Sequence, residues 1–593
     1  MLRNSISRAL LLAAICLLAL APFFWKGNPS GHDFEFHVYS WMDALSQWKH
    51  GIMSPHWAAL AHWGYGEPRF VFYPPASWTL GAALGAALPW KLVPGAYCWI
   101  VLTLAAGTMY WLAREWLDRK DAFFAAAFYA LNPYHLLIVY WRSAYAELMA
   151  AVLLPLALLF LLRLTYSVSG RSESPALRRE EFGLAKWRAF ILPTMWLGLT
   201  LAATWLTNLP AAVMVHYSVA AVAIVLAIRA MVREHAWTPA AWRPLMGTAM
   251  AVSLGAGLAS FFLLPAIYEQ RWINVNQVLS PGVRPQDNFL FTTLADTDHN
   301  RFNRLVSIVA VAEIAVLVFA IFSTQRNRVR EKRFVLAGAV PGSRGERGAR
   351  PWMPLYIWGA ASGLIMLSIT NFLWQHLPKF RFVQLPFRWL LCMNVSLAIL
   401  VAMTTKHWNS RLVIWMLLLV TLIVAGHFTQ PPWWDTAADI REMSDFMENG
   451  TGYEGTDEYV PAGADASEVN KTLPRISDES GEPIANKMIA WGAVEKHFTV
   501  QAQAPENIVV RLFNYPAWKV VVNRKPVATD KTETTGLMVI PVAAGESDVY
   551  INFQRTIDRV AGIFVSLAAV ALFVIILLGS TRRRDASTST RTG

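Results

Sequence analysis

Twelve segments of the chain are apolar and long enough to cross a lipid bilayer, and no other feature restricts the fold as strongly. No soluble fold of 593 residues buries so many long apolar runs, and only 16% of the residues are charged. The first segment follows Arg3 and Arg8, and no small-residue cleavage site follows Lys26, so it is expected to be a retained span. The sequence predicts a mainly α, polytopic helical membrane protein, with spans at about 8–25, 95–113, 122–140, 145–163, 190–207, 209–230, 246–268, 304–323, 352–370, 388–403, 412–428 and 559–579.

The net charge of +12 does not indicate a nucleic-acid-binding protein, because of where the charge lies. Residues 429–557 hold 19 acidic and 11 basic residues, a net of −8, so the rest of the chain carries +20. That excess falls in short loops after alternate apolar segments, which is typical of cytoplasmic loops. With the N-terminus inside, twelve spans place six basic clusters in the cytoplasm: 114–120, 163–188, 229–243, 326–350, 406–411 and 582–584.

Residues 76–90 are apolar but only about 15 long and rich in Gly and Ala, which is short for a span. Counting them as a span would put the 114–120 cluster outside and invert every later loop. We therefore expect a re-entrant or surface-lying helix here.

The segment 429–557 has the pattern of a β-rich domain outside the membrane. Short strands bounded by Pro, Gly and Asn predict a β-sandwich, with strands at 497–502, 508–513, 518–522, 537–541 and 549–553. Residues 435–485 are acidic and rich in Gly and Pro, and are expected to be loops. The stretches 168–188 and 326–350 are expected to be flexible linkers.

The chain therefore divides into three parts. Residues 1–428 form a transmembrane module with an outer loop at 26–75, residues 429–557 form the extracytoplasmic domain, and residues 558–593 form a last helix and a basic tail.

Ionisable residues follow the first span at once, in Gly31-His32-Asp33-Phe34-Glu35-Phe36-His37. Such groups are costly near a bilayer, so their clustering indicates a functional site. Apolar residues at intervals of three and four then predict an amphipathic helix lying at the membrane surface: Phe34, Val38, Trp41, Leu45 and Trp48. Asp33 at its start and His37 one turn later share a face. Alternatively, Asp33 is only the helix N-cap, or His32 and His37 ligate a metal.

Two further outer segments, 140–147 and 384–389, carry ionisable residues. Glu147 begins a long apolar span, where an acid is costly unless it is paired or used, and the alternative to function is an ion pair with Arg142. Arg388 lies at the outer lip of a span, where a snorkelling anchor is the alternative. The three cysteines lie inside apolar segments, so neither a disulfide framework nor a thiolate metal site is expected.

Several motifs, taken in order, resemble the GT-C superfamily of membrane glycosyltransferases. Asp33 in the first outer loop is followed by Gly64-Tyr65-Gly66-Glu67-Pro68 and by Phe70-Val71-Phe72-Tyr73-Pro74-Pro75. The stretches 49–57, 140–147, 384–389 and 514–520 extend the resemblance over most of the chain. More narrowly, the pattern is similar to the YfhO-like branch and to bacterial membrane proteins labelled "6-pyruvoyl-tetrahydropterin synthase-related".

This resemblance implies transfer of a sugar from a polyprenyl-phosphate carrier to a glycan, lipid or protein acceptor, on the outer face of a bacterial inner (cytoplasmic) membrane. The first-loop acid of the family corresponds to Asp33, as the expected base, and its second-loop acid corresponds to Glu147. Some relatives carry paired acids and a metal in the second loop. This chain has a single Glu beside an Arg, so a divalent cation (Mg²⁺ or Mn²⁺) is left open and no metal ligand is assigned.

These residue types suit that chemistry. A lipid phosphate leaves readily when cations stabilise its charge, and guanidinium matches phosphate bidentately. The acceptor hydroxyl needs a base within hydrogen-bond reach, and attack opposite the phosphate inverts the anomeric centre. Substrate contacts are expected from Glu35, His37, Arg69, Tyr73, Arg142, Tyr145, Arg388 and Trp389.

Two other functions fit parts of the pattern. A transporter or lipid flippase places ionisable groups and broken helices at mid-membrane, often in repeated halves; here the span centres carry few charges, Glu313 being the main exception, and no repeat is evident. A non-catalytic assembly or carbohydrate-binding protein would depend on the β domain and not on Asp33. The glycosyltransferase is the interpretation we favour, with membrane lipids as further partners.

Overall fold

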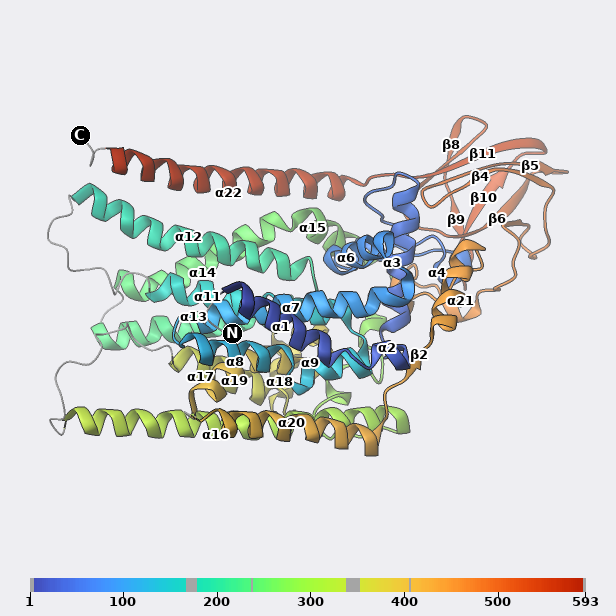
Figure 1. Cartoon of the computed structure of the whole chain (residues 1–593). Helices are drawn as coiled ribbons and strands as arrows, with labels where there is room; N and C mark the ends of the chain where they lie inside the picture. The colour runs from blue at the N-terminus through green and yellow to red at the C-terminus, as the bar shows by residue number, and fades with distance from the viewer. Residues whose placement is uncertain (1–4, 167–178, 236–237, 337–351, 405–406, 590–593) are drawn as a thin grey trace.

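The computed structural model describes residues 5–166, 179–235, 238–336, 352–404 and 407–589. Within them, nine helices are long and apolar enough to cross a membrane, and two bent helix pairs raise the number to eleven. The eleven coincide with eleven predicted spans and run side by side in one bundle (Figure 1). The unbroken spans are built from α1 (Ser5–Ala19) with α2 (Phe23–Lys26), α7 (Val93–Ala113), α8 (Arg119–Ala130) with α9 (Pro133–Leu137), α10 (Tyr145–Ala150) with α11 (Leu154–Tyr166), α13 (Leu209–Glu234), α16 (Thr297–Leu336), α19 (Leu390–Thr404), α20 (Trp408–Thr429) and α22 (Ile557–Ser589).

Three predicted spans are not among the nine unbroken candidate helices of the described residues. The pair α14 (Pro239–Leu258) and α15 (Ser260–Glu269) is bent by 78°, and the pair α17 (Trp352–Ile365) and α18 (Asn371–His376) by 95°. The predicted span 190–207 is part of α12 (Arg179–Trp205), which packs against α11 and α14. Threonines interrupt its apolar run, and their hydroxyls donate to carbonyl oxygens of their own helix.

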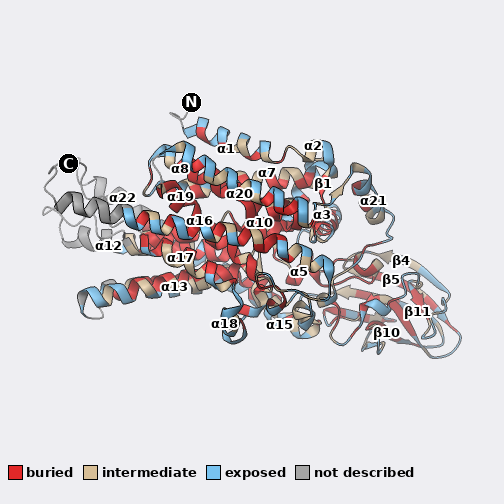
Figure 2. Cartoon of the chain, turned by 90° about the horizontal axis from the view of Figure 1, so that it is seen from below, coloured by how far each residue is buried: buried red, intermediate tan, exposed pale blue. Residues whose placement is uncertain are grey.

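Burial follows position in the bundle (Figure 2). The helix α19 is buried along nearly its whole length. In contrast, α1 and α22 expose large apolar side chains, among them Leu18 (75% exposed) and Phe564 (67%). Exposed apolar faces on outer helices are expected where lipid replaces water.

The helix α3 (Phe34–Lys49) lies across the end of the bundle nearest the strands, and α6 (Pro75–Ala87) packs against it (Figure 1). The predicted apolar stripe of α3 is buried except for Trp48, which is half-buried. The two helices cross closely, because a Cβ at Gly81 of α6 would lie 2.2 Å from the indole of Trp41. At 13 residues, α6 is shorter than a span. The membrane position expected for 76–90 stays a prediction.

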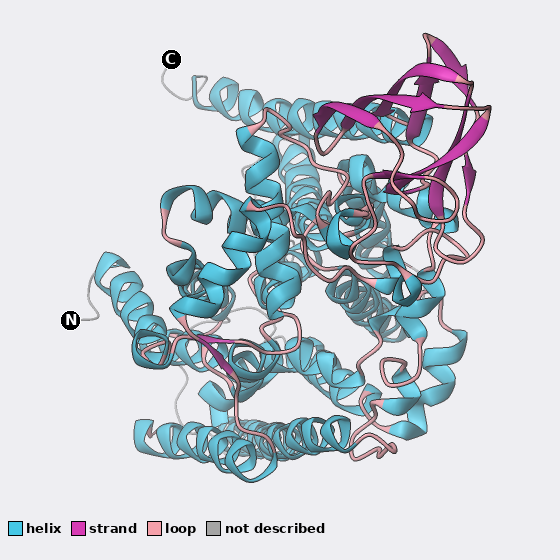
Figure 3. Ribbon diagram, turned by 90° about the vertical axis from the view of Figure 1, so that its right-hand side faces the viewer, coloured by secondary structure: helices cyan, strands magenta, loops and turns pink. Residues whose placement is uncertain are grey.

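Antiparallel strands form the C-terminal domain (Figure 3). They make two sheets, with strand orders β3-β6-β10-β9 and β4-β5-β11-β7-β8. Side chains from both sheets meet in one core, as the β-sandwich prediction requires. All five predicted strands are present. The strands are β3 (Ile476–Ser477), β4 (Asn486–Trp491), β5 (Glu495–Ala502), β6 (Glu506–Phe513), β7 (Trp518–Val522), β8 (Lys525–Val527), β9 (Asp530–Lys531), β10 (Leu537–Val542) and β11 (Gly545–Phe553).

The first outer loop completes the core of this sandwich. Trp57, Tyr65 and Phe72 are buried among the side chains of the two sheets, and the Trp57 ring lies 5.4 Å from that of Trp518. The link continues at Tyr453, whose ring stacks on Tyr39 of α3 at 4.3 Å. The loop that begins at Asp33 is thus packed against the β domain.

Two predictions of irregular structure are wrong. Residues 435–485 contain a helix, α21 (Ala437–Glu448), which is stabilised by a capping box between Thr436 and Asp439 and buries Ile440 and Met443. Within the predicted linkers, 179–188 belongs to α12 and 326–336 to α16. The other linker residues, 168–178 and 337–350, lie outside the described residues.

Candidate functional site

The loop that contains Asp33 is hydrogen-bonded to the turn at Arg142 and Ser143. The backbone N–H of Asp33 donates to the carbonyl oxygen of Arg142 at 2.9 Å. The Gly31 N–H donates to the Ser143 hydroxyl at 3.0 Å, and that hydroxyl donates to the Pro29 carbonyl at 2.8 Å. A Cβ at Gly31 would lie 2.3 Å from the Trp141 carbonyl oxygen, so only glycine allows this approach.

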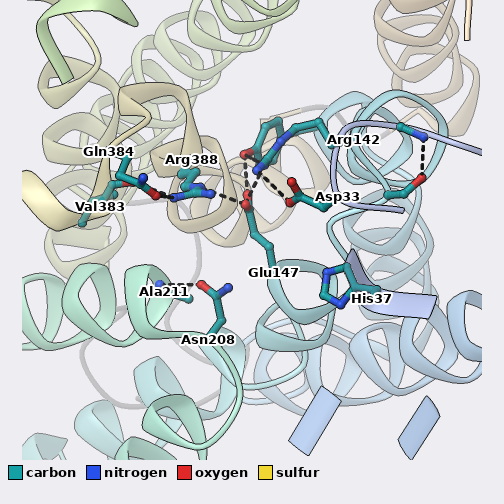
Figure 4. A network of polar contacts seen from close by, with 12 residues as sticks. Asp33, His37, Arg142, Glu147, Asn208, Ala211, Val383, Gln384 and Arg388 are labelled. Carbon is teal, nitrogen blue, oxygen red and sulfur yellow. Dashed lines mark hydrogen bonds and ion pairs between the residues drawn. The ribbon is translucent and has the colours of Figure 1, made fainter. Parts of the chain in front are cut away.

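Asp33 occupies the N-cap position of α3, yet its carboxylate accepts no capping hydrogen bond. The carboxylate instead lies 3.8 Å from the Arg142 guanidinium and is 40% exposed. The helix-cap explanation of this residue therefore fails. The side chain is accessible and directed at the guanidinium of Arg142, which belongs to a distant segment of the chain (Figure 4).

Glu147 lies at the centre of the polar cluster, at the start of α10 (Figure 4). One of its oxygens accepts from Arg142 at 2.6 Å and from Arg388 at 3.1 Å, and the other accepts from the Tyr134 hydroxyl. Its side chain is 1% exposed and that of Arg142 3%. The predicted ion pair with Arg142 is present, and a second guanidinium joins it.

Backbone irregularities place both arginines. Arg142 ends a π-helical turn, η2 (Ile138–Arg142), and Ser143 follows with φ = 50° in the left-handed region. Arg388 lies in the 3-10 turn η8 (Pro386–Trp389), behind a γ-turn at Gln384 where φ is 64° and the Leu385 N–H donates to the Val383 carbonyl at 2.7 Å. Strained residues of this kind cluster at functional sites.

The Arg388 guanidinium points inward and is not a snorkelling anchor. It donates to the Val383 carbonyl at 2.8 Å and to the Gln384 side-chain oxygen at 3.1 Å, as well as to Glu147. The Gln384 amide donates in turn to the Val278 carbonyl at 2.7 Å. Arg388 is therefore held from the loop side and from the bundle side.

His37 borders this cluster one helical turn after Asp33 (Figure 4). Its ring is 2% exposed, its Nε2 lies 3.5 Å from the Tyr73 hydroxyl, and the ring centroid lies 5.2 Å from that of Tyr145. Burial, together with the charges of Arg69 and Arg142 and against that of Asp33, lowers the pKa of His37 to about 4. His37 is therefore neutral at physiological pH.

Three residues expected to contact substrate lie apart from these carboxylates and guanidiniums. The Arg69 guanidinium is 1% exposed, bonded to Glu67 at 2.5 Å and to the Ser40 hydroxyl at 3.0 Å. Trp389 is 2% exposed and packs on Phe380 in the core. Glu35 is on the exposed side of α3.

Three residues of the site were not predicted from the sequence: Tyr134, Asn208 and, in its supporting role, Gln384. Tyr134 follows Asn132-Pro133, and Asn208 precedes Leu209-Pro210, both signatures of a helix start. The Asn208 side chain caps α13 by accepting from the Ala211 N–H at 2.9 Å, and Figure 4 shows its amide beside the cluster. These cap signals indicated helix ends that converge on the site.

The arrangement does not suit a divalent cation. A cation bound here would have to displace guanidinium groups from Glu147 and approach two arginines at short range. Among the described residues, no group of three or more His, Cys, Asp or Glu side chains is placed to hold a metal ion. No step is therefore assigned to a metal.

No protein-family model matches the chain. No curated protein matches it either. Among solved structures it is similar to the apo form of the Archaeoglobus fulgidus oligosaccharyltransferase, with 14% identity over 77% of this chain and 60% of that chain and a TM-score of 0.41. It is also similar to the archaeal oligosaccharyltransferase AglB from the same organism in complex with an inhibitory peptide and a dolichol-phosphate, with 15% identity over 76% and 60% of the chains and a TM-score of 0.41. The chain spans about three fifths of the length of these proteins.

Proposed function

We propose that this protein is an integral-membrane glycosyltransferase, which moves a sugar from a polyprenyl-phosphate carrier to an acceptor at the end of the bundle that faces the β domain. One observation carries the proposal: the uncapped, partly exposed Asp33 carboxylate faces the buried Arg142 guanidinium, which shares the Glu147 carboxylate with the Arg388 guanidinium. This is the combination of base and anion-stabilising groups that transfer from a lipid phosphate requires.

Arg142 and Arg388 stabilise the leaving group, the phosphate of the lipid carrier. Phosphate charge that develops as the sugar–oxygen bond breaks is stabilised by guanidinium donors that are already in place. Glu147 holds both groups at one point and offsets their charge while no phosphate is bound. Removing one such stabilising donor typically costs about 10²–10³ in rate.

The acceptor is activated by Asp33. Its carboxylate accepts the proton of the acceptor hydroxyl as the oxygen attacks the anomeric carbon, and the carrier phosphate leaves with the bonding electrons on the opposite side. Inversion at that carbon follows from this geometry. Neutral His37, one helical turn after Asp33, and the Tyr73 hydroxyl 3.5 Å from its Nε2 add hydrogen-bonding groups near this carboxylate.

Glu313, the charge that favoured a transporter, serves as a junction between helices. Its carboxylate accepts from the Tyr134 backbone N–H at 3.3 Å and from the Asn394 amide at 2.9 Å. It therefore ties α16 and α19 to the short helix whose Tyr134 supports Glu147. This role needs no substrate path through the bundle.

Reconstitution separates the three functions. The purified chain is placed in vesicles with polyprenyl-phosphate-linked sugars and a membrane-derived acceptor fraction, and the lipid and glycan products are analysed by mass spectrometry. Release of polyprenyl phosphate together with a glycosylated acceptor supports the proposal. Movement of intact lipid-linked sugar between leaflets identifies a flippase, and binding with neither event identifies an assembly protein.

A further inference from the structure

An open hollow of about 310 Å³ lies beside the Asp33 loop. It is lined by Ser30, His32 and Glu35 from the first outer loop and by Trp433 and Asp435 from the segment between α20 and α21. A volume of this size is at the lower end of the range for small-molecule sites, so the part of a ligand that fits is small.

The hollow is built by two segments far apart in the sequence. The strands β1 (Asn28–Pro29) and β2 (Trp434–Asp435) pair antiparallel, with Asn28 opposite Asp435. The Ser30 N–H donates to the Trp433 carbonyl at 3.1 Å. These bonds fix the aromatic and acidic groups on one side relative to those on the other.

The lining combines an aromatic platform with two acids. Trp433 is 49% exposed, and its ring lies 5.6 Å from that of His32, which itself packs on Phe302 at 4.7 Å. Glu35 and Asp435 line the same hollow. Partial burial, and then the charge of Asp435, raise the pKa of Glu35. Two neighbouring carboxylates disfavour phosphate and other anions but accept hydrogen bonds from hydroxyl groups.

We propose that this hollow binds a sugar unit of the acceptor, with the ring against Trp433 and its hydroxyls donating to Glu35 and Asp435. The assignment as an acceptor subsite rests on the proposed transferase function. Its position agrees with that role: His32 and Phe34, the two neighbours of Asp33 in the chain, both line the hollow. The donor's phosphate and the acceptor would thus bind to surfaces of opposite charge, one cationic and one acidic.

The test is direct binding of sugars in the absence of any donor. The full-length protein in lipid nanodiscs is applied to an array of defined oligosaccharides, each offered both free and attached to a lipid, together with basic peptides. We expect the wild-type protein to retain a subset of glycans, and Trp433→Ala or Glu35→Gln to weaken that retention about tenfold or more. Trp433→Phe keeps an aromatic face and should retain most of the binding. Asp445→Asn, an exposed acid on α21, is the matched control.

The outcomes separate the subsite from the transferase. Retention of the free and the lipid-linked form of one glycan identifies the sugar as the determinant, whereas retention of the lipid-linked form alone identifies a glycolipid headgroup as its source. The subsite would be overturned if no glycan is retained, or if Trp433→Ala retains glycans as well as the wild-type protein does. It would also be overturned if the protein captures basic peptides in place of glycans and Glu35→Gln abolishes that capture. Binding is measured without a donor, and transfer is measured in the separate vesicle assay, so the two results are independent. A protein that binds glycans but transfers no sugar would refute only the transferase. A protein that transfers sugar but binds no glycan in this hollow would refute only the subsite.

Discussion

Asp33 and Arg142 are joined twice: the Asp33 N–H bonds to the Arg142 carbonyl at 2.9 Å, and the Asp33 carboxylate lies 3.8 Å from the Arg142 guanidinium. The first contact fixes the backbone, and the second leaves the carboxylate partly exposed. A carboxylate that is partly exposed and attached to a fixed backbone is suited to accept a proton from a bound ligand.

Asp33→Asn tests that role. Because the carboxylate makes no capping bond, the variant should keep the thermal stability of the wild-type protein. Sugar transfer should fall about 10²–10⁴-fold, the usual contribution of a general base. Asp445→Asn is the control for loss of one exposed acid, and a fully active Asp33→Asn protein would remove Asp33 from the mechanism.

Gln384→Gly separates strain from function. Glycine adopts positive φ without cost, so the backbone at 384 is relieved of strain worth about 1–3 kcal/mol. The variant also loses the side-chain oxygen that orients Arg388. We expect unchanged or higher thermal stability with lower kcat at similar KM, and equal losses of stability and activity would show that Gln384 is only structural.

Local patterns predicted the parts of this chain that local interactions decide. Eleven spans, five strands and the apolar stripe of α3 were predictable, since each follows from periodicity or apolar length. The convergence of Asp33, Arg142, Glu147 and Arg388 agrees with the predicted topology, in which the charge pattern puts all three segments on one side of the membrane.

Tertiary contacts decide the rest. Tyr134 reaches Glu147 because a π-helical turn intervenes between them, and no sequence periodicity marks such a turn. Arg69 lies between two motifs of the family resemblance, yet it is buried and paired with the carboxylate of Glu67, two residues away. Trp57 and Phe72 enter the core of a sandwich more than 400 residues later in the chain, which a local pattern cannot reveal.

The junction between α3 and the β domain should respond to pH through Asp43. Burial raises the pKa of Asp43 to about 6, although hydrogen bonds from Gln47 and Tyr453 and the charge of Arg69 lower it. The folded state therefore binds this proton more tightly than the unfolded state, whose pKa is near 3.8. The stabilisation is complete below about pH 4 and is lost as pH rises to about 6.

Asp43→Asn should remove that dependence, worth on the order of 3 kcal/mol. The measurement is the difference in unfolding temperature between variant and wild type across pH 4 to 8, with Asp445→Asn as control. Glu458, whose burial raises its pKa from 4.5 to about 7, contributes an overlapping window in both proteins, which cancels in the difference between them. A constant difference between variant and wild type would show that Asp43 does not titrate in this range.

Membrane topology is testable with single cysteines, because the three native cysteines are buried. A cysteine at exposed Glu468, in the β domain, should react with an impermeant maleimide on intact cells. A cysteine at exposed Lys120 should react only after the membrane is permeabilised. The opposite labelling of Lys120→Cys would mean that 76–90 crosses the membrane.

Glu147→Gln tests whether the two arginines form an anion site. The change removes the carboxylate that buried Arg142 and partly buried Arg388 share, and removing one partner of a buried pair typically costs about 3–5 kcal/mol. We expect a lower unfolding temperature and impaired transfer. Glu448→Gln, an exposed acid at the end of α21, should change neither.

Inorganic phosphate then distinguishes an anion site from a simple structural pair. In Glu147→Gln the freed guanidiniums can bind phosphate, and a ligand that binds only the folded state raises the unfolding temperature by mass action. We therefore expect phosphate to stabilise this variant more than the wild-type protein, with sodium chloride at equal ionic strength as the control. If phosphate and chloride act alike on both proteins, Arg142 and Arg388 do not form a phosphate site, and the assignment of the leaving-group role to them is wrong.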